Sequence, residues 1–182
     1  MTNTNTNTIV NTTNTSNQNV NIIQQGRVKI ESAGGVYLLS TNDFSLKIPG
    51  SWYTTEVQDN RPVLFIASNE NTDGVLSIKN RETSFVMNLS VNEDQRSLVE
   101  YLEDKPVDVG ELISEKEMVI ASYEGAVREI DATSIDSMEG SYSLEYFVKK
   151  NSKIIRVLFL ALSKGGIDSN RSELEKVVES FE

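Results

Sequence analysis

Apolar and polar residues alternate in many short segments of this chain, and this period of two constrains the possible folds more than any other feature. Within residues 43–49, Phe44, Leu46 and Ile48 alternate with polar residues. Successive side chains of a strand point to opposite faces of a sheet, so this pattern is typical of a strand with one buried face. The same pattern, or a short apolar run, predicts strands at residues 36–39, 63–67, 75–78, 84–91, 118–123, 126–130, 142–148 and 154–162. We expect these strands to form an antiparallel sheet.

The last two predicted strands flank a short polar turn and therefore predict a long hairpin. Asn151 and Ser152 separate residues 142–148 from residues 154–162. The second of these segments is the longest apolar run in the chain, but it contains Arg156. A membrane-spanning helix needs about 20 apolar residues, so we interpret the run as a buried strand.

Two helices are predicted between and after the strands. Asn92 and Gln95 resemble a capping box in front of apolar residues at helical spacing, which predicts a helix over residues 93–104. Ser172 and Glu175 resemble a second capping box, which predicts an amphipathic helix at the end of the chain. The apolar face of this terminal helix would consist of Leu174, Val177, Val178 and Phe181. Several strands with two helices indicate an α+β fold rather than alternating βαβ units.

The composition excludes several classes of function. A chain of 182 residues fits one domain with a single core. It contains no cysteine and no histidine, which removes thiolate and imidazole metal ligands, thiol nucleophiles and the most common general base. The net charge of -10 opposes binding to nucleic acids. We expect no cofactor, no metal and no nucleic-acid partner, and we expect the protein not to be an enzyme. A hydrolase that uses only carboxylates and hydroxyls is the remaining catalytic alternative.

Residues 1–25 are rich in threonine and asparagine and contain few apolar residues. Such a segment buries too little apolar surface to offset the entropy lost on ordering, so we predict a disordered linker followed by one domain at residues 26–182. The given sequence contains neither an apolar signal core nor a charged signal start. The segment is either a tether whose signal and anchor are missing from the given chain, or the polar tail of a cytoplasmic protein. We favour the tether, because polar spacers suit a link between membrane and domain.

Three segments of the predicted domain resemble the PsbP-like family. Residues 42–52 end in Pro-Gly-Ser-Trp, residues 98–102 read Leu-Val-Glu-Tyr-Leu, and residues 174–181 end in Ser-Phe. The resemblance spans residues 35–181 and implies the Mog1/PsbP-like fold, an α/β/α sandwich with a central antiparallel sheet. Prokaryotic members are commonly secreted or lipoprotein-anchored. The resemblance therefore implies a non-enzymatic accessory or binding domain outside the cytoplasmic membrane.

Trp52 and a polar loop are two candidate binding sites. The indole of Trp52 either forms a wall on which a ligand stacks or packs in the core, and we favour packing. Asn69, Asn71 and Asp73 partly match a calcium-binding loop, but the twelfth position is Asn80 where a bidentate glutamate is needed. A hairpin turn at Asp73 is the favoured interpretation of this loop.

A basic group at the tip of the predicted hairpin is the third candidate. Lys149, Lys150 and Lys153 lie there with Arg156, and they form either a docking patch for an acidic partner or a solvated tip. The leading hypothesis is a monomeric domain that binds a protein or a small ligand and contacts the membrane only through an N-terminal anchor. The alternative is a cytoplasmic protein-binding adaptor of the Mog1 type.

Overall fold

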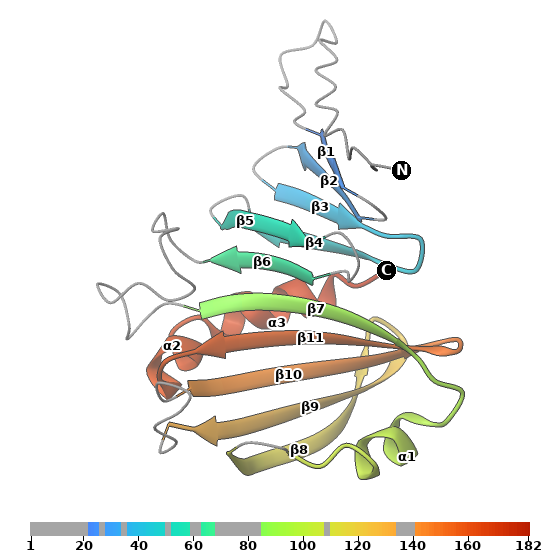
Figure 1. The fold of residues 1–182 in the computed structure, drawn as a ribbon, viewed down its shortest axis with the longest axis vertical. Coiled ribbons are helices and arrows are strands. Elements are labelled where there is room, and N and C mark those ends of the chain that lie inside the picture. The colour runs from blue at the N-terminus through green and yellow to red at the C-terminus, as the bar shows by residue number, and fades with distance from the viewer. Residues whose placement is uncertain are drawn as a thin grey trace, which may run out of the picture.

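Two antiparallel sheets and three helices make up the described part of the chain in the computed structural model (Figure 1). The structure describes residues 22–25, 28–33, 36–49, 52–58, 63–67, 85–107, 110–133 and 141–182. Most of the predicted linker, residues 1–21, lies outside this range, and so does the predicted strand at residues 75–78.

The smaller sheet has four strands in the order β1-β2-β3-β4, and the larger sheet has seven in the order β5-β6-β7-β11-β10-β9-β8. The strands of the smaller sheet are β1 (Ile22–Gln25), β2 (Val28–Ala33), β3 (Val36–Ser40) and β4 (Ser45–Pro49). Those of the larger sheet are β5 (Tyr53–Gln58), β6 (Val63–Ala67), β7 (Phe85–Glu93), β8 (Glu111–Ile120), β9 (Tyr123–Ala132), β10 (Ser141–Lys150) and β11 (Lys153–Ala161). Strand β1 covers the last residues of the segment that we expected to be a linker.

Helices lie on both faces of the larger sheet. The helix α1 (Leu98–Glu103) packs on one face, and α2 (Lys164–Asp168) and α3 (Arg171–Glu179) lie behind the other face in the view of Figure 1. This arrangement confirms the predicted α+β fold, an α/β/α sandwich with a central antiparallel sheet. None of these helices, in the part of the chain that the structure describes, has the length and apolar character needed to cross a membrane.

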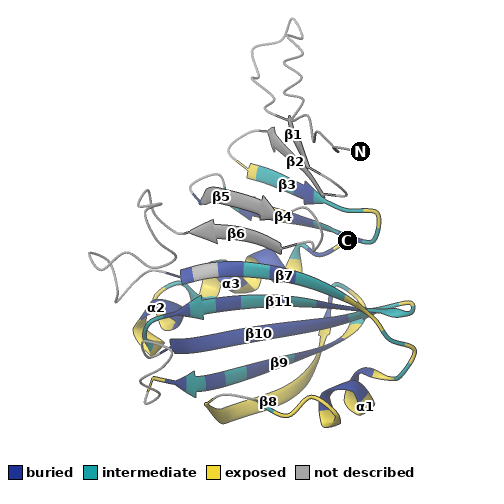
Figure 2. Cartoon of the chain, viewed as in Figure 1, coloured by how far each residue is buried: buried dark blue, intermediate teal, exposed yellow. Residues whose placement is uncertain are grey.

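The hairpin of β10 and β11 forms the centre of the larger sheet and confirms the predicted long hairpin. Its register pairs Tyr142 with Ala161 at one end and Lys150 with Lys153 at the turn. The first eight residues of β10 are all buried, so both faces of this strand are covered (Figure 2). Because both faces are covered, polar residues of β10 are enclosed along with the apolar ones.

A cluster of aromatic side chains lies in the core between the larger sheet and the helices α2 and α3. Phe159 is fully buried and contacts Trp52, Phe85 and Tyr146 edge-on, with ring centroids 6.4, 6.1 and 6.2 Å apart. Perpendicular ring contacts place the positive edge of one ring against the negative face of the next. Burial raises the pKa of Tyr146 to about 12, so its hydroxyl stays protonated at all physiological pH values.

The end of the chain joins α3 to the smaller sheet. The backbones of Ser45 and Glu182 exchange two hydrogen bonds of 3.0 and 3.1 Å. The rings of Phe44 and Phe181 stack at 5.5 Å, and the backbone N–H of Lys47 donates to the Ser180 hydroxyl at 2.8 Å. The predicted packing of Phe181 with the apolar face of the terminal helix is confirmed.

Both predicted helix starts differ from the structure, the first cap by five residues (Asn92 against Ser97) and the second by two (Ser172 against Asn170). Strand β7 continues through Glu93, because Asn92 pairs with Ile154 of β11, and a capping box of Ser97 and Glu100 begins α1 instead. The backbone of Asn92, which this box would have used, is therefore held in the sheet. Pairing with a central strand outweighs a local cap here.

At the second helix, the chain is helical before the predicted cap at Ser172. The Ser163 hydroxyl accepts from the N–H of Gly166 and starts α2. The helix α3 then follows from Asn170, whose side-chain amide donates to the carbonyl of Gly166 at 2.8 Å. Ser172 and Glu175 lie inside the helix and form no capping box, because the turn after α2 has already set its start.

Candidate ligand-binding site

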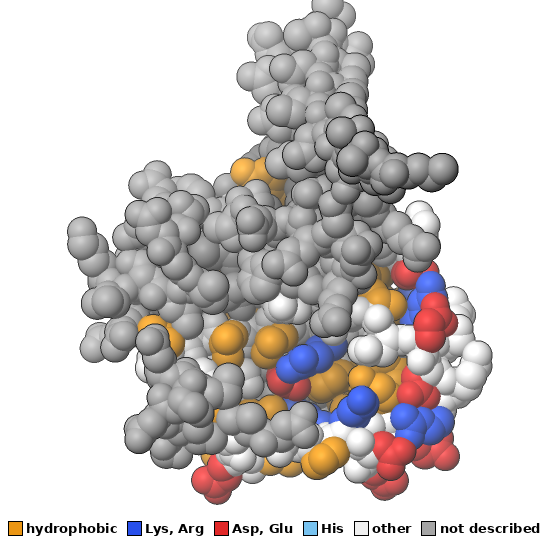
Figure 3. Space-filling model, viewed as in Figure 1, with side chains coloured by type: hydrophobic (Ala, Val, Ile, Leu, Met, Phe, Trp, Pro, Cys, Tyr) orange, Lys and Arg blue, Asp and Glu red, His pale blue; other side chains and the backbone are white. Residues whose placement is uncertain are grey.

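A pocket of about 500 Å³ lies on the α1 face of the larger sheet, and we call it the open-face pocket. Strands β7, β9, β10 and β11 form its floor, and α1 with residues 105–107 closes one side. In Figure 3, hydrophobic side chains on this face are interspersed with Lys, Arg, Asp and Glu side chains. Residues that contribute to the lining include Tyr101, Ile130, Ser143, Phe147, Leu158 and Leu160. The pocket therefore combines an apolar floor with polar groups, as ligand sites commonly do.

The sheet register places a buried ion pair in the floor of this pocket. Glu145 of β10 and Arg156 of β11 pair through the carboxylate and Nη2 of the guanidinium. The Glu145 side chain is 9% exposed, and that of Arg156 is 35% exposed. Within the described residues, the Nε of Arg156 is buried without a hydrogen-bond partner. A buried donor without a partner is costly, so an oxygen brought to this nitrogen by a small movement of the pocket side chains would be stabilised there.

Arg128 fixes the position of α1 against the pocket. Its side chain is 8% exposed and pairs through Nε with Glu115. Its other two nitrogens donate to the carbonyls of Lys105 at 2.6 Å and Leu102 at 2.8 Å. The guanidinium also lies 5.8 Å from the ring centroid of Phe147. Arg128 therefore holds the C-terminal end of α1 on β9 and defines the wall of the pocket.

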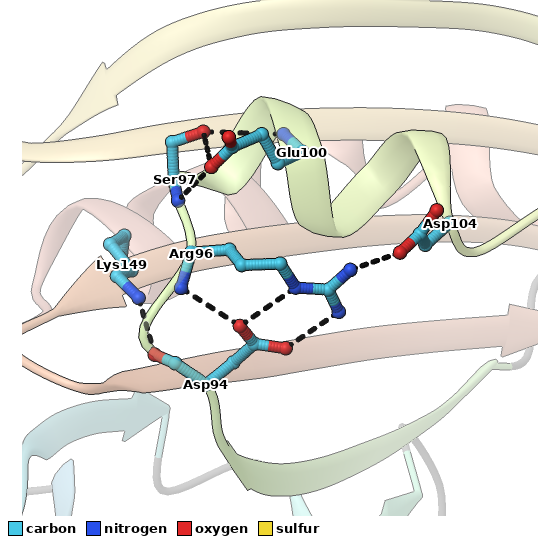
Figure 4. Close-up of polar contacts among 6 residues, drawn as sticks. All are labelled: Asp94, Arg96, Ser97, Glu100, Asp104 and Lys149. Atoms are coloured by element: carbon cyan, nitrogen blue, oxygen red, sulfur yellow. Dashed lines mark hydrogen bonds and ion pairs between the residues drawn. The ribbon is translucent and has the colours of Figure 1, made fainter.

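The start of α1 is held by a second polar cluster, shown in Figure 4. The backbone N–H of Arg96 and two nitrogens of its guanidinium donate to the Asp94 carboxylate. The guanidinium also pairs with Asp104, which lies at the C-terminal end of α1. The Lys149 ammonium donates to the backbone carbonyl of Asp94 at 2.5 Å. These contacts link the β7–α1 connection to β10, so they position α1 from its first turn.

The hydrogen bonds from Arg96 lower the pKa of Asp94 from 3.8 to about 2. Because folding lowers this pKa, the stabilisation by the ionised carboxylate is present above pH 3.8 and is lost as the pH falls toward 2. An NMR titration of the Asp94 carboxyl is expected to show a midpoint near 2 in the wild type and a midpoint near the ordinary value in Arg96→Ala. Equal midpoints in the two proteins would contradict the assignment of the shift to Arg96.

Lining charges give the pocket a basic character within an acidic chain. The lining includes Lys105, Arg128 and Arg156 against a single carboxylate, Glu145. With Glu115, which neutralises Arg128, the pocket still carries one net positive charge, three minus two, in a protein of net charge -10. Burial raises the pKa of Tyr101, which keeps its hydroxyl as a further donor. The arrangement favours a ligand with an oxygen acceptor and an apolar part.

The described residues hold no group of three or more Asp and Glu side chains that could hold a metal ion. Glu145 in the pocket pairs with Arg156, and Glu115 outside it pairs with Arg128. Paired carboxylates of this kind orient guanidinium groups, so both arginines are held as directed donors.

Among the candidates from the sequence, Trp52 lies in the core. It is 3% exposed, with its ring centroid 4.8 Å from that of Phe85. This position agrees with the packing interpretation and leaves no open indole face for a ligand. Asn69, Asn71 and Asp73 lie outside the described residues.

The three lysines of the hairpin tip are each engaged within the chain. Lys149 binds the Asp94 carbonyl, as described above, and Lys150 lies 5.2 and 5.5 Å from the ring centroids of Tyr123 and Phe181. Lys153 contacts the carboxylate of Asp43 at 2.5 Å, and this hydrogen bond raises its pKa. They point in different directions, to α1, to the end of the chain and to the smaller sheet, and docking at this tip stays a prediction.

Glu145 and Arg128 are the residues of the pocket that the sequence did not identify. By sequence, Arg156 groups with the hairpin lysines, whereas the strand register directs it to the open face beside Glu145. A usable signal was present for Glu145 and Arg156, because each is the single charge in an otherwise uncharged stretch of its strand, whereas Arg128 is followed by Glu129. Which of them meet depends on the register across β8, β9, β10 and β11, and the sequence does not specify that register.

No family model matches the chain, and no curated protein matches it in sequence. Among solved structures, the cyanobacterial PsbP, CyanoP, from Synechocystis sp. PCC 6803 gives a TM-score of 0.51 at 14% identity, with 83% of this chain and 96% of that chain covered. A protein of unknown function from Pseudomonas aeruginosa gives a TM-score of 0.45 at 9% identity, with 81% and 96% covered. The similarity to CyanoP shows that this chain has a PsbP-like fold.

Proposed function

We propose that this chain is a non-enzymatic binding domain and that it binds its ligand in the open-face pocket. The observation that carries the proposal is the buried Nε of Arg156, held in place by Glu145 at the floor of a cavity of about 500 Å³. The ligand presents an oxygen acceptor to Arg156 and lays an apolar part on Ile130, Leu158 and Leu160. A small ligand and a side chain of a partner protein both meet this description.

A matched pair of probes tests this chemistry, because decanoate and decanol differ mainly in the carboxylate. We expect the wild type to bind decanoate more tightly than decanol by isothermal titration calorimetry. Arg156→Gln should weaken decanoate binding by about tenfold or more, since a hydrogen bond to a charged group contributes about 1.5–3 kcal/mol. Binding of decanol should change little.

Lys176→Gln is the control for this measurement, because it removes the same charge from an exposed position on α3. An equal loss of decanoate binding in the two variants would point to net charge rather than to the pocket. If neither probe binds the wild type, the open-face pocket is not a site for amphipathic acids and the proposal fails.

We further propose that the domain works outside the cytoplasmic membrane on a polar tether. The proposal draws on the Thr/Asn-rich composition of residues 1–25 and on the likeness of the fold to a PsbP-like protein. Fractionation of the native host with intact mass measurement tests it. A membrane-associated species with additional N-terminal mass is expected. A species in the cytoplasmic fraction without such mass would favour the adaptor of the Mog1 type.

A further inference from the structure

Strand β8 forms an open edge of the larger sheet. Its hydrogen-bonded neighbour is β9, and its first nine residues are exposed. Several of its exposed side chains are apolar, with exposed fractions of 50% for Ile113 and 73% for Val119. A long edge strand with exposed apolar side chains is a template for an added strand.

An apolar groove of about 430 Å³ runs beside this edge, between β8 and α1. The helix contributes Leu98, Val99 and Leu102, and β8 contributes Met118 and Val119. Val99 is 41% exposed although it lies on the same short helix as buried Leu98. The groove gives side chains of an added strand a place to pack, in addition to the backbone pairing of β8.

The hairpin turn determines which backbone groups of β8 face outward. Ala121 and Ser122 have φ values of 48° and 78°, as in a two-residue turn of type I′, and Ile120 pairs with Tyr123. In such a hairpin the closing pair is hydrogen-bonded, and bonded and non-bonded pairs alternate along the strands. The N–H and C=O groups of Glu117 and Val119 therefore point away from β9.

The charges of β8 disfavour several registers in which it would pair with a second copy of itself. In a twofold antiparallel pair, directly opposite residues point to the same face of the sheet, so one residue must lie opposite its own copy. Centring the pair on Glu115 or Glu117 places that glutamate opposite its own copy, and centring it on Lys116 places Glu115 opposite Glu117 twice. Like charges directly opposite are destabilising. Centring the pair on Met118 places Glu117 opposite Val119 and avoids this repulsion, so a second copy is the occupant against which a partner segment must be tested.

We propose that β8 binds an extended segment of a partner protein that presents basic and apolar side chains in turn on the face toward α1. Glu111 and Glu117 on the edge and Glu124 beside the groove supply negative charge, and the net charge of -10 adds to it. Glu117 and Val119 lie on the same face of β8, so a basic residue of the partner would lie opposite Glu117, and the apolar residue two positions away would pack on Val119 and in the groove. This surface is separate from the open-face pocket and independent of the function proposed there.

The test uses a capped, fluorescently labelled peptide of the length of β8 with the repeat Lys-Thr-Val-Thr, which places lysine and valine in turn on one face of the added strand. We expect saturable binding to the full chain by fluorescence anisotropy at low salt, and about tenfold slower amide exchange at Glu117 and Val119 in the complex. Glu117→Lys should weaken binding by about fivefold or more, because it replaces an attraction by a repulsion. Glu175→Lys, an equal change of charge on α3, should have a much smaller effect.

Three results would overturn the proposal. The first is no binding of the lysine peptide, or equal binding of a peptide with glutamate in place of lysine. The second is an equal loss of affinity in Glu117→Lys and Glu175→Lys, which would indicate a non-local charge effect. The third is a dimer in sedimentation experiments whose amides at Glu117 and Val119 are protected without peptide, which would make a second copy the occupant.

Discussion

Replacement of Phe159 by alanine is expected to lower the free energy of unfolding by about 3–5 kcal/mol. The ring is fully buried at the centre of the larger sheet and contacts Trp52, Phe85 and Tyr146. Its removal leaves a cavity that β11 cannot close, because this strand is paired on both sides with β7 and β10. Urea denaturation followed by tryptophan fluorescence measures the change, since Trp52 is the single tryptophan.

Leu160→Ala is the control for this prediction. Leu160 lies on the same strand but on the other face, where it is half-buried in the open-face pocket. Its truncation should cost clearly less than that of Phe159, because a cavity open to water leaves no enclosed void. A larger loss in Leu160→Ala would mean that the main core lies on the α1 face of the sheet, contrary to the structure.

Replacement of Arg128 by methionine is expected to lower the free energy of unfolding by roughly 2–4 kcal/mol, from the lost hydrogen bonds of a charged donor. The carbonyls of Leu102 and Lys105 lose their donor, and α1 loses its attachment to β9. Methionine keeps much of the apolar contact with Phe147, so packing loss contributes little. Amide exchange should accelerate in α1 more than in β10.

Glu115→Gln separates the two roles of Arg128. The Glu115 side chain is 38% exposed, so its pair with Arg128 is partly screened and its removal should cost about 1 kcal/mol or less. If Glu115→Gln is as damaging as Arg128→Met, the ion pair rather than the carbonyl contacts would hold α1. Unchanged exchange in α1 of Arg128→Met would contradict the attachment altogether.

Among the strands that the sequence predicted best are those with continuous or nearly continuous apolar runs. The prediction at residues 63–67 coincides with β6, and the hairpin at residues 142–162 closely matches β10 and β11. Strand β8 was predicted only from residue 118, because residues 111–117 are mostly charged or exposed and show no buried face. At the edge of a sheet, hydrogen bonds to one neighbouring strand can hold a strand whose side chains are all exposed. The apolar alternation used for prediction detects only strands with a buried face, so it did not detect residues 111–117.

The candidate site was predicted less well than the fold, for a physical reason. The open-face pocket depends on which residues lie opposite one another, and Glu145 meets Arg156 through a register that spans residues 141–161. Local patterns fix the face of a residue but not its cross-strand neighbour. The lysines of the hairpin tip show the same limit, since their contacts to Asp94, Tyr123 and Asp43 come from three distant segments.

The order of strands in the larger sheet also has a consequence for synthesis of the chain. Strand β11 lies between β7 and β10, although it is translated after both. While the chain emerges from the ribosome, β5 to β7 and β8 to β10 are two unfinished halves, each with an exposed edge. Only the arrival of β11 joins them, because it pairs with β7 along nine residues and with β10 along nine. The nascent chain therefore exposes these unpaired edges until its last strand is made, which favours slow folding and transient association.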